Sequence, residues 1–256
     1  MKSMIAFLKK EWMEWIRSGK LVIMLVVFVI FGIMNPAFAK ITPWLMEAMS
    51  DSLEGTGLMV GEVEVDAMTS WTQYYKNIPM ALIVFVLMIS GSFTTEYQRG
   101  SLILVVTKGL ARWKIYLAKS IMFSILWTGC YWLYYGITYF YNDIYWDNSI
   151  AESPFAAASV VWLFGIFMIT LVLIFSAVSS NNTMVLIGVG AVAVVSYIVE
   201  MLPKVSEYAP TKLMGMLAIL SKESQFSDYY NAIAVTVVIS LVALIGGNIL
   251  FRRKRI

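Results

Sequence analysis

Residues 96–120 read EYQRGSLILVVTKGLARWKIYLAKS, a basic segment that lies between two of the most apolar parts of the chain. The segment holds five cations and one carboxylate, and it has the apolar run LILVV at its centre. A short connection between membrane spans needs no such run, whereas a contiguous exposed apolar cluster usually marks a protein interface. We therefore expect this stretch to be a cytoplasmic loop that binds another protein.

The composition around this loop is that of a membrane protein. Of the 256 residues, 60% are hydrophobic and 14% are charged, and the mean hydropathy is +0.76. A soluble domain has about 25% charged residues. The chain has no histidine and a single cysteine, Cys130, so the sequence predicts neither a metal site nor a disulfide framework.

Six segments have the length and apolar character of a transmembrane helix, which needs about 20 such residues. They lie at 21–39, 78–93, 116–139, 155–178, 183–199 and 232–251. The apolar segment 210–220 is too short to cross and is expected to be a re-entrant or interfacial helix between spans five and six. These features predict an all-α membrane protein with one transmembrane domain over 1–256.

Charge predicts the orientation of these spans. With the N-terminus inside, the inner segments hold fourteen cations and three acids, and the outer segments hold five cations and thirteen acids. Because cytoplasmic loops are enriched in lysine and arginine, we expect both termini and the loop 94–115 in the cytoplasm. Residues 40–77 and 203–230 are then extracellular.

Residues 1–18 predict an amphipathic helix with Trp12 and Trp15 on its apolar face and Lys9 and Lys10 opposite. Such a helix lies in the interface plane of the cytoplasmic leaflet, either as a functional element or as a simple anchor before span one. The later triplet at 37–39, AFA, also fits a signal cleavage site. The glutamates within the helical pattern of 1–18 oppose that interpretation.

The centres of the predicted spans contain no Asp, Glu, Lys or Arg. Buried ionisable groups mark proton relays and catalytic centres in membranes, so we expect neither a proton-coupled transporter nor an intramembrane enzyme; sodium coupling through backbone carbonyls stays open. The chain also lacks a G-x-x-x-x-G-K-[ST] motif. We expect no catalytic residues, no bound cofactor and no nucleic-acid partner, and any energy for transport must come from another subunit.

Within the basic loop, Gly100 and Gly109 bracket about two turns of helix. Ser101 is a candidate N-cap and Gly109 a candidate C-terminal cap. The β-branched residues between them make a poor autonomous helix, which would be stable only when packed against the protein or a partner.

The sequence E-Y-Q-R-G-S-L, an apolar turn and A-R-W-K-I-Y-L-A-K resemble the loop after the second span of ABC-2-type permeases, the membrane subunits of one class of ABC transporter. The matching residues are Glu96, Gly100, Ser101, Leu102, Arg112 and Lys119. The resemblance extends over the whole chain through the N-terminal helix, the six spans and the internal termini. One departure is the sequence at 109–112, GLAR, where the family has Pro-Val-Ser-Arg.

This resemblance implies a coupling helix that binds a separate cytoplasmic ABC ATPase, which would carry the ATP and magnesium. The implied contact residues are Arg99, Gly100, Ser101, Leu102, Ile103, Leu104, Val105, Val106 and Thr107. Glu96 and Arg112 would brace the loop, Glu96 against a basic residue of the N-terminal helix. The resemblance also implies a second permease subunit, identical or not, and a location in a prokaryotic cell membrane.

From residue 127 to residue 146, ten of twenty residues are aromatic. One interpretation is an interfacial belt. The other is a surface along which an amphipathic substrate moves, with Trp127, Tyr131, Tyr134 and Tyr135 as candidate path residues.

Two functions follow. The first is export of an amphipathic or hydrophobic substrate; small permeases of this kind resemble bacteriocin, lantibiotic and phenol-soluble-modulin exporters, so a peptide is the first choice. Lipid-linked glycans, copper-site maturation and sodium efflux stay open. The alternative is a non-transporting scaffold or sensor that binds a cytoplasmic protein through residues 96–120.

Overall fold

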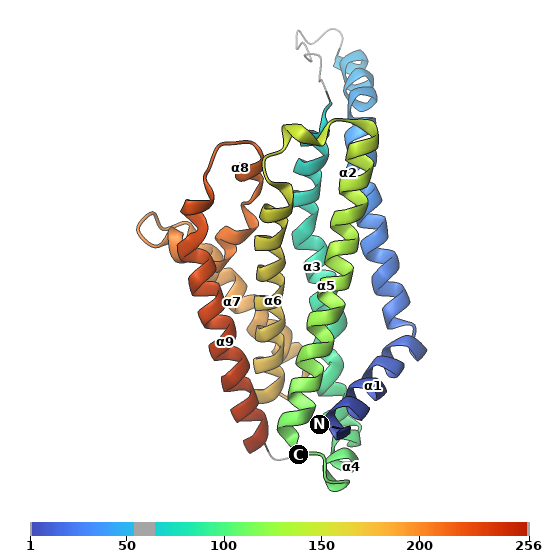
Figure 1. Cartoon of the computed structure of the whole chain (residues 1–256), viewed down its shortest axis with the longest axis vertical. Helices are drawn as coiled ribbons and strands as arrows, with labels where there is room; N and C mark the ends of the chain where they lie inside the picture. The colour runs from blue at the N-terminus through green and yellow to red at the C-terminus, as the bar shows by residue number, and fades with distance from the viewer. Residues whose placement is uncertain (1, 54–64, 255–256) are drawn as a thin grey trace.

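The computed structural model describes residues 2–53 and 65–254, and in these ranges the protein is all-α (Figure 1). The α-helices are α1 (Lys2–Arg17), α2 (Lys20–Leu53), α3 (Ala67–Gln98), α4 (Ser101–Thr107), α5 (Arg112–Tyr145), α6 (Pro154–Val178), α7 (Asn182–Glu200), α8 (Leu217–Leu220) and α9 (Tyr230–Arg253). Four 3₁₀-helices connect them: η1 (Asn148–Ile150), η2 (Ser206–Tyr208), η3 (Pro210–Met214) and η4 (Phe226–Tyr229).

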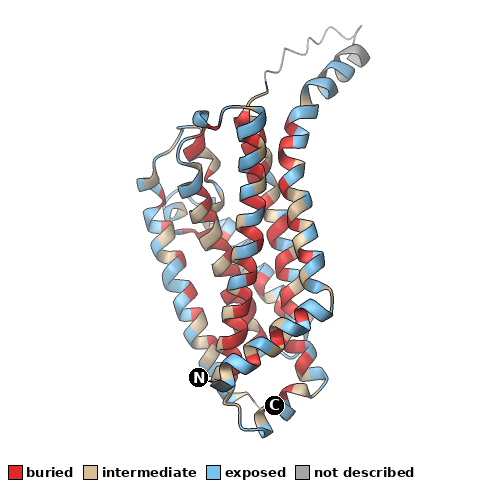
Figure 2. Ribbon diagram, turned by 45° about the vertical axis from the view of Figure 1, so that its right-hand side comes forward, coloured by how far each residue is buried: buried red, intermediate tan, exposed pale blue. Residues whose placement is uncertain are grey.

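The long helices form one elongated bundle, and α1, α4 and the C-terminal end of α9 lie together at one end of it (Figure 1). Five helical segments among the described residues are long and apolar enough to cross a membrane: Lys20–Ala48, Ala67–Gln98, Pro154–Val178, Asn182–Glu200 and Phe226–Arg253. Each overlaps one of the six predicted spans. Exposed positions follow the outer faces of the bundle (Figure 2). Apolar side chains among them, such as those of Val238 and Val242, are available to lipid.

The remaining predicted span, 116–139, lies within α5, which runs along the bundle beside α2, α3 and α6 (Figure 1). Helix α5 is long enough to cross a membrane, but even its most apolar stretch has a lower mean hydropathy than those of the five candidate spans. Its place in the fold explains why: α5 packs against α1, α2, α3, α6 and α9. A helix shielded by neighbours on several sides can hold aromatic and polar side chains that a lipid-facing helix could not.

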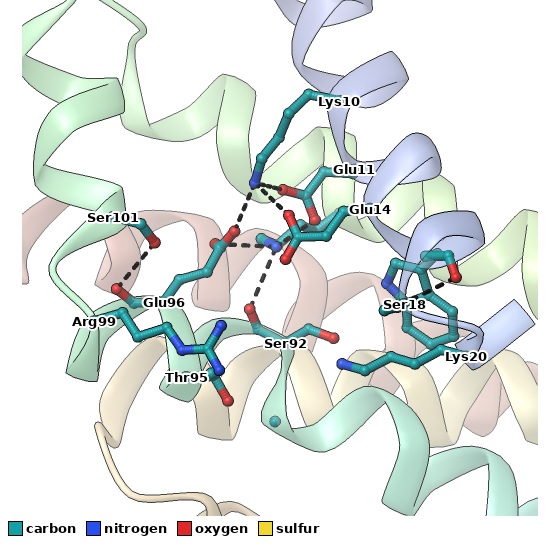
Figure 3. A pocket seen from close by; sticks show the side chains of 13 residues that line it. Lys10, Glu11, Glu14, Ser18, Lys20, Ser92, Thr95, Glu96, Arg99 and Ser101 are labelled. Atoms are coloured by element: carbon teal, nitrogen blue, oxygen red, sulfur yellow. Dashed lines mark hydrogen bonds and ion pairs between the residues drawn. The ribbon is translucent and has the colours of Figure 1, made fainter.

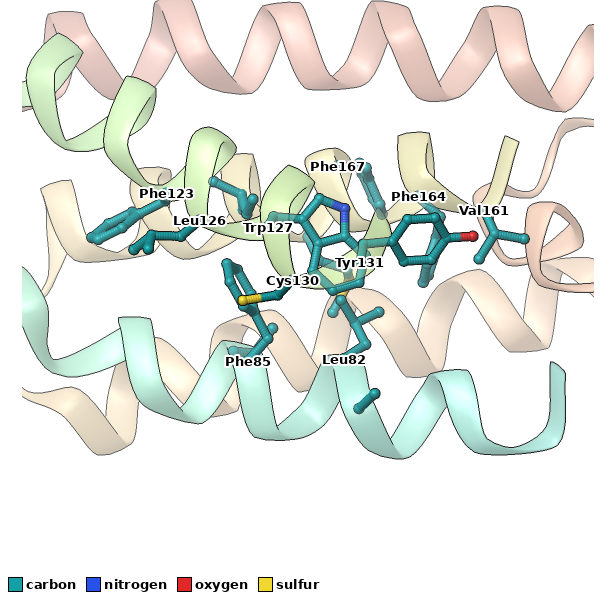
Figure 4. Packing of buried hydrophobic residues seen from close by; sticks show 14 of the residues in the cluster. Leu82, Phe85, Phe123, Leu126, Trp127, Cys130, Tyr131, Val161, Phe164 and Phe167 are labelled. Carbon is teal, nitrogen blue, oxygen red and sulfur yellow. The ribbon is translucent and has the colours of Figure 1, made fainter. Parts of the chain in front are cut away.

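The centre of the bundle is built from aromatic side chains of α5 and their neighbours on α3 and α6 (Figure 4). Trp127 packs against the backbone of α6 at Gly165, where an added Cβ would lie 2.0 Å from Cε2 of the indole. The indole Nε1 donates a hydrogen bond to the carbonyl of Trp162 at 3.0 Å. Glycine at position 165 is thus what lets α5 and α6 approach this closely.

Helix α1 is the predicted N-terminal helix, and it turns into α2 at an elbow formed by Ser18 and Gly19, whose φ is 73°. The face of α1 that packs on the bundle includes the predicted apolar residues Trp12 and Trp15, but it is wider than predicted. It also buries Phe7 and Glu11, which are 6% and 2% exposed. The structure therefore turns a glutamate inward. Helix α2 continues without a break through residues 37–39.

At the opposite end of the bundle, the predicted helix at 210–220 is divided between η3 and α8. Both pieces pack into the bundle: η3 contacts α6, α7 and α9, and Thr211 Oγ1 donates to the carbonyl of Ser196 at 3.1 Å. Of the predicted outer segment 40–77, the helices α2 and α3 cover all except residues 54–66, and residues 54–64 lie outside the described part of the chain.

Candidate functional site

The apolar run LILVV lies in α4, which projects from the end of the bundle that carries the N-terminus (Figure 1). Gly109 ends the helix as predicted, with φ of 87°. Its N–H donates to the carbonyl of Val106 at 2.9 Å, and the N–H of Leu110 donates to that of Val105 at 3.3 Å, which together form a Schellman motif. The N-cap is Gly100, with φ of 66°, in place of the predicted Ser101.

Helix α4 is fixed to the bundle by one face and presents the other to solvent. Leu102 is 1% exposed, and Val105 and Val106 are half-buried against the core. Ile103 and Leu104 are 46% and 64% exposed. A seven-residue helix without a buried face would be unstable in water, so the buried side chains explain why α4 forms and leave its apolar tip exposed.

Directly behind α4 lies a cluster of charged side chains that joins α1, α3 and α5 (Figure 3). The ammonium of Lys119 on α5 is 2.6 Å from Glu11 Oε2 and 3.1 Å from Glu96 Oε2. The ammonium of Lys10 is 2.9 Å from Glu11 Oε1 and 3.0 Å from Glu96 Oε1. The carboxylates of Glu11 and Glu96 therefore each pair with both ammonium groups. These four side chains join α1, α3 and α5.

The two lysines differ in burial. The side chain of Lys119 is 1% exposed, and its ammonium also lies 5.2 Å from the centroid of the Phe93 ring, a cation–π contact. The side chain of Lys10 is 44% exposed and pairs in addition with Glu14 at 2.8 Å. Lys119 is thus the internal counter-ion of the cluster, and Lys10 closes it toward solvent.

This arrangement sets the protonation of the α1 groups. Burial acts to raise the pKa of Glu11, but the ammonium groups of Lys119 and Lys10 outweigh it and hold that pKa below its ordinary value. Burial acts to lower the pKa of Lys10, and the contacts with Glu14, Glu11 and Glu96 overcome this and raise it. Both residues are therefore charged at neutral pH.

Carboxylate oxygens of Glu11, Glu14 and Glu96 lie within 4.8 Å of one another, a spacing that would also suit a cation. In this structure two ammonium groups already lie among these oxygens: Lys10 pairs with all three carboxylates and Lys119 with Glu11 and Glu96, each at 3.1 Å or less. The donor set is therefore that of an ion-pair network.

The sequence predicts part of this cluster. The conjectured contact between Glu96 and a basic residue of the N-terminal helix is present, with Lys10 as the partner. The sequence does not predict the roles of Glu11 and Lys119, because the helical pattern of 1–18 places Glu11 on no particular face and the charge bias of inner loops alone accounts for a lysine at position 119. The resemblance did include Lys119 among the matching positions, and that was the available signal.

Arg112 lies elsewhere. Its guanidinium donates to the carbonyl of Arg252 at 3.1 Å and to that of Lys254, so it joins the start of α5 to the C-terminal end of α9. The side chain of Arg99 points away from α4, into a cavity that it lines together with Lys20 and Ser92 (Figure 3). The predicted bracing role of Arg112 and the predicted ATPase contact of Arg99 stay predictions.

The four candidate path residues on α5 are packed in the interior. Trp127, Tyr131 and Tyr134 are each at most 1% exposed, and Tyr135 is 7% exposed. Tyr134 stacks on Tyr74 of α3 with ring centroids 4.5 Å apart. A substrate would reach these side chains only if the helices parted. Further out, Phe140 and Tyr145 are exposed, as expected for an interfacial belt.

No protein-family model matches the chain. The chain is similar to a protein of Bacillus subtilis (strain 168) described as uncharacterized transmembrane protein YxlG. The two are 24% identical over 234 residues, which cover 90% of this chain and 89% of that protein. The similarity and the candidate spans identify this protein as a multi-pass protein of a bacterial cell membrane.

Proposed function

We propose that this protein is the transmembrane subunit of an ABC exporter and that α4 is its coupling helix. The observation that carries the proposal is the apolar tip of α4, Ile103 and Leu104, which is exposed beyond the bundle while Leu102 fixes the helix to it. An exposed apolar tip on a well-fixed helix favours burial in a groove of another protein. In this proposal the partner ATPase binds ATP and magnesium, and the present chain has no catalytic role.

The ion-pair cluster supports the mechanical part of this proposal. Ser101 Oγ donates to the carbonyl of Glu96 at 3.4 Å, and the carboxylate of Glu96 contacts lysines on α1 and α5. A displacement of α4 would therefore be transmitted to α1, α3 and α5 together. A partner can drive a conformational change only if it binds the two conformations differently. The contacts of Glu96 would carry such a change from α4 to the spanning helices.

The proposed topology has six crossings, with α5 as the one that hydropathy alone does not identify. Both termini and α4 lie in the cytoplasm, in agreement with the excess of lysine and arginine in the segments at that end of the bundle. A second permease subunit completes the exporter. The proposed substrate is amphipathic, and a peptide is the first class to test.

The test is co-purification from the native bacterium followed by measurement of ATP hydrolysis in nanodiscs. We expect the intact protein to bring an ATPase and the double variant Ile103→Asp/Leu104→Asp to lose it. Loss of a buried apolar anchor costs about 2 kcal/mol or more, which corresponds to about 30-fold in affinity. Leu102 is left unchanged because it is buried.

The matched control is Ile103→Leu/Leu104→Ile, which keeps the tip apolar and should retain the ATPase. Equal amounts of ATPase on the aspartate variant and on the control would exclude α4 as the docking helix. Stimulation of the bound ATPase by amphipathic peptides supports export. An ATPase that binds but never responds to any substrate favours the scaffold or sensor function instead.

A further inference from the structure

A cavity of about 390 Å³ lies between the elbow that joins α1 to α2 and the end of α3. It borders the ion-pair cluster and is separate from the tip of α4 (Figure 3). Its walls carry four cations, three carboxylates and several hydroxyl groups. The three carboxylates are Glu11, Glu14 and Glu96, and all of them already pair with Lys10 or Lys119.

The other two cations of the cavity pair with no carboxylate of the described residues, and Lys20 makes a cation–π contact with the ring of Trp15 at 5.7 Å. Lys20 begins α2 and Arg99 follows α3, and their side chains point toward one another from opposite sides of Ser92 (Figure 3). Within the described part of the chain, neither has a carboxylate within ion-pair distance. Two like charges that converge on one cavity repel each other, and an anion between them would relieve that repulsion.

The space between these cations also offers hydrogen-bonding groups. The hydroxyl of Ser92 is buried and has no hydrogen-bond partner among the described residues, and Thr95 lines the cavity beside it. Gly91 adds no side chain that would fill the space. A guanidinium fork, an ammonium and a hydroxyl group together are suited to the oxygens of a phosphate.

The surroundings indicate which phosphate compound fits. The elbow is where the amphipathic helix α1 gives way to the apolar helix α2, so we expect the cavity at the depth of lipid headgroups. Beside it, Ile16, Val22 and Ile23 are 48%, 58% and 56% exposed. Acyl chains could lie along these side chains while the headgroup enters the cavity, and a free phosphate would make no use of them.

We propose that this cavity binds the headgroup of an anionic phospholipid, with the phosphate held between Arg99 and Lys20. The site would tie the α1–α2 elbow to α3 through a lipid of the leaflet at this end of the bundle. The proposal does not depend on export, because it concerns a lipid contact at a position that does not include the tip of α4.

The test uses native mass spectrometry of the delipidated protein with phosphatidylglycerol, with phosphatidylcholine as the neutral comparator. We expect the double variant Lys20→Gln/Arg99→Gln to bind phosphatidylglycerol about tenfold more weakly than the wild type, because hydrogen bonds to charged groups are lost. The matched control is Lys9→Gln/Arg17→Gln, which removes the same charge from exposed positions of α1 that do not line the cavity. The control should bind as the wild type does.

Arg99→Lys is a milder variant for the case in which the double variant fails to fold. It keeps the charge, removes the fork, and should give an intermediate affinity. Equal weakening in the cavity variant and the α1 control would show general attraction to a basic surface and overturn the proposal. Displacement of phosphatidylglycerol by equimolar glycerol 3-phosphate would overturn it as well, because the ligand would then be a free phosphate compound.

Discussion

The buried ammonium of Lys119 contacts two carboxylates from helices far apart in the sequence, Glu11 and Glu96. Burial of charges is costly, and removing one partner from a buried ion pair leaves the other uncompensated. The exposed pair between Lys10 and Glu14 contributes far less, because water screens it. On α1, we therefore expect the carboxylate of Glu11 to contribute much more to the stability of the fold than that of Glu14.

This contrast predicts different effects for two matched substitutions on α1. Glu11→Gln should lower the free energy of unfolding by about 3 kcal/mol because it leaves Lys119 with a single carboxylate. Glu14→Gln should lower it by about 0.5 kcal/mol or less, as for other exposed pairs of this spacing. Denaturant unfolding of the purified protein at pH 7, followed by tryptophan fluorescence, measures both. Equal effects would mean that burial of Glu11 contributes nothing.

The pH dependence of the same pair of variants follows from the pKa of Glu11. Because that pKa is lower in the folded protein than its ordinary value of 4.5, the charged form stabilises the fold above that pH. The stabilisation is lost as the pH falls through the folded-state pKa. The difference between the wild type and Glu11→Gln should therefore shrink in acid, whereas the Glu14→Gln variant should follow the wild type.

The sequence could predict the contact of Glu96 with the N-terminal helix because both segments were placed at the same end of the bundle. It could not predict the partners of Lys119. The charge bias of inner loops accounts for a lysine at position 119 without any buried partner, and helical periodicity places Glu11 on no particular face. Whether a charged residue near a membrane end is buried depends on which neighbouring helix covers it, and that information is tertiary.

At the scale of the elements, the position of α5 in the bundle is likewise not predictable from its sequence. Its length and apolar pattern predict a spanning helix, but neither distinguishes a central helix from a peripheral one. The aromatic run was consistent with an interfacial belt or a substrate surface, and its inner part is instead the core of the bundle. The central position of α5 depends on its close contact with α6, which the glycine at position 165 of α6 permits.

We predict that Gly165→Ala disrupts this contact. A Cβ at position 165 would lie 2.0 Å from Cε2 and 2.2 Å from Cζ2 of Trp127, a buried ring that cannot move aside. Overpacking of this kind costs about 1–3 kcal/mol. Thermal unfolding in detergent should show a lower midpoint and a change in the fluorescence of the displaced indole.

Gly129→Ala is the control for this experiment, since Gly129 lies two residues from Trp127 and its added Cβ would meet nothing within 4 Å. It should leave the unfolding midpoint unchanged or raise it slightly, because alanine favours helix over glycine. A loss of stability as large as that of Gly165→Ala would indicate that any added methyl on these helices is harmful.

At the scale of the whole molecule, one end of the bundle concentrates the features that suit a partner. The tip of α4, the ion-pair cluster, the cavity proposed to bind lipid and the link from Arg112 to the carbonyls of α9 all lie there. The other end is closed by η3 and α8, which pack between the long helices. A force applied at the first end would therefore meet helices already joined to one another, which is the property that a coupling subunit needs.

The proposed orientation is tested by single cysteines at the two ends, introduced as Thr107→Cys on α4 and Ser149→Cys in η1. Both positions are exposed, and the native Cys130 is buried and should give little background. In intact cells, a membrane-impermeant maleimide should label the Ser149→Cys variant and leave the Thr107→Cys variant unlabelled until the membrane is broken. The reverse pattern would place α4 outside the cell, where no cytoplasmic ATPase could reach it, and the proposed function would fail with it.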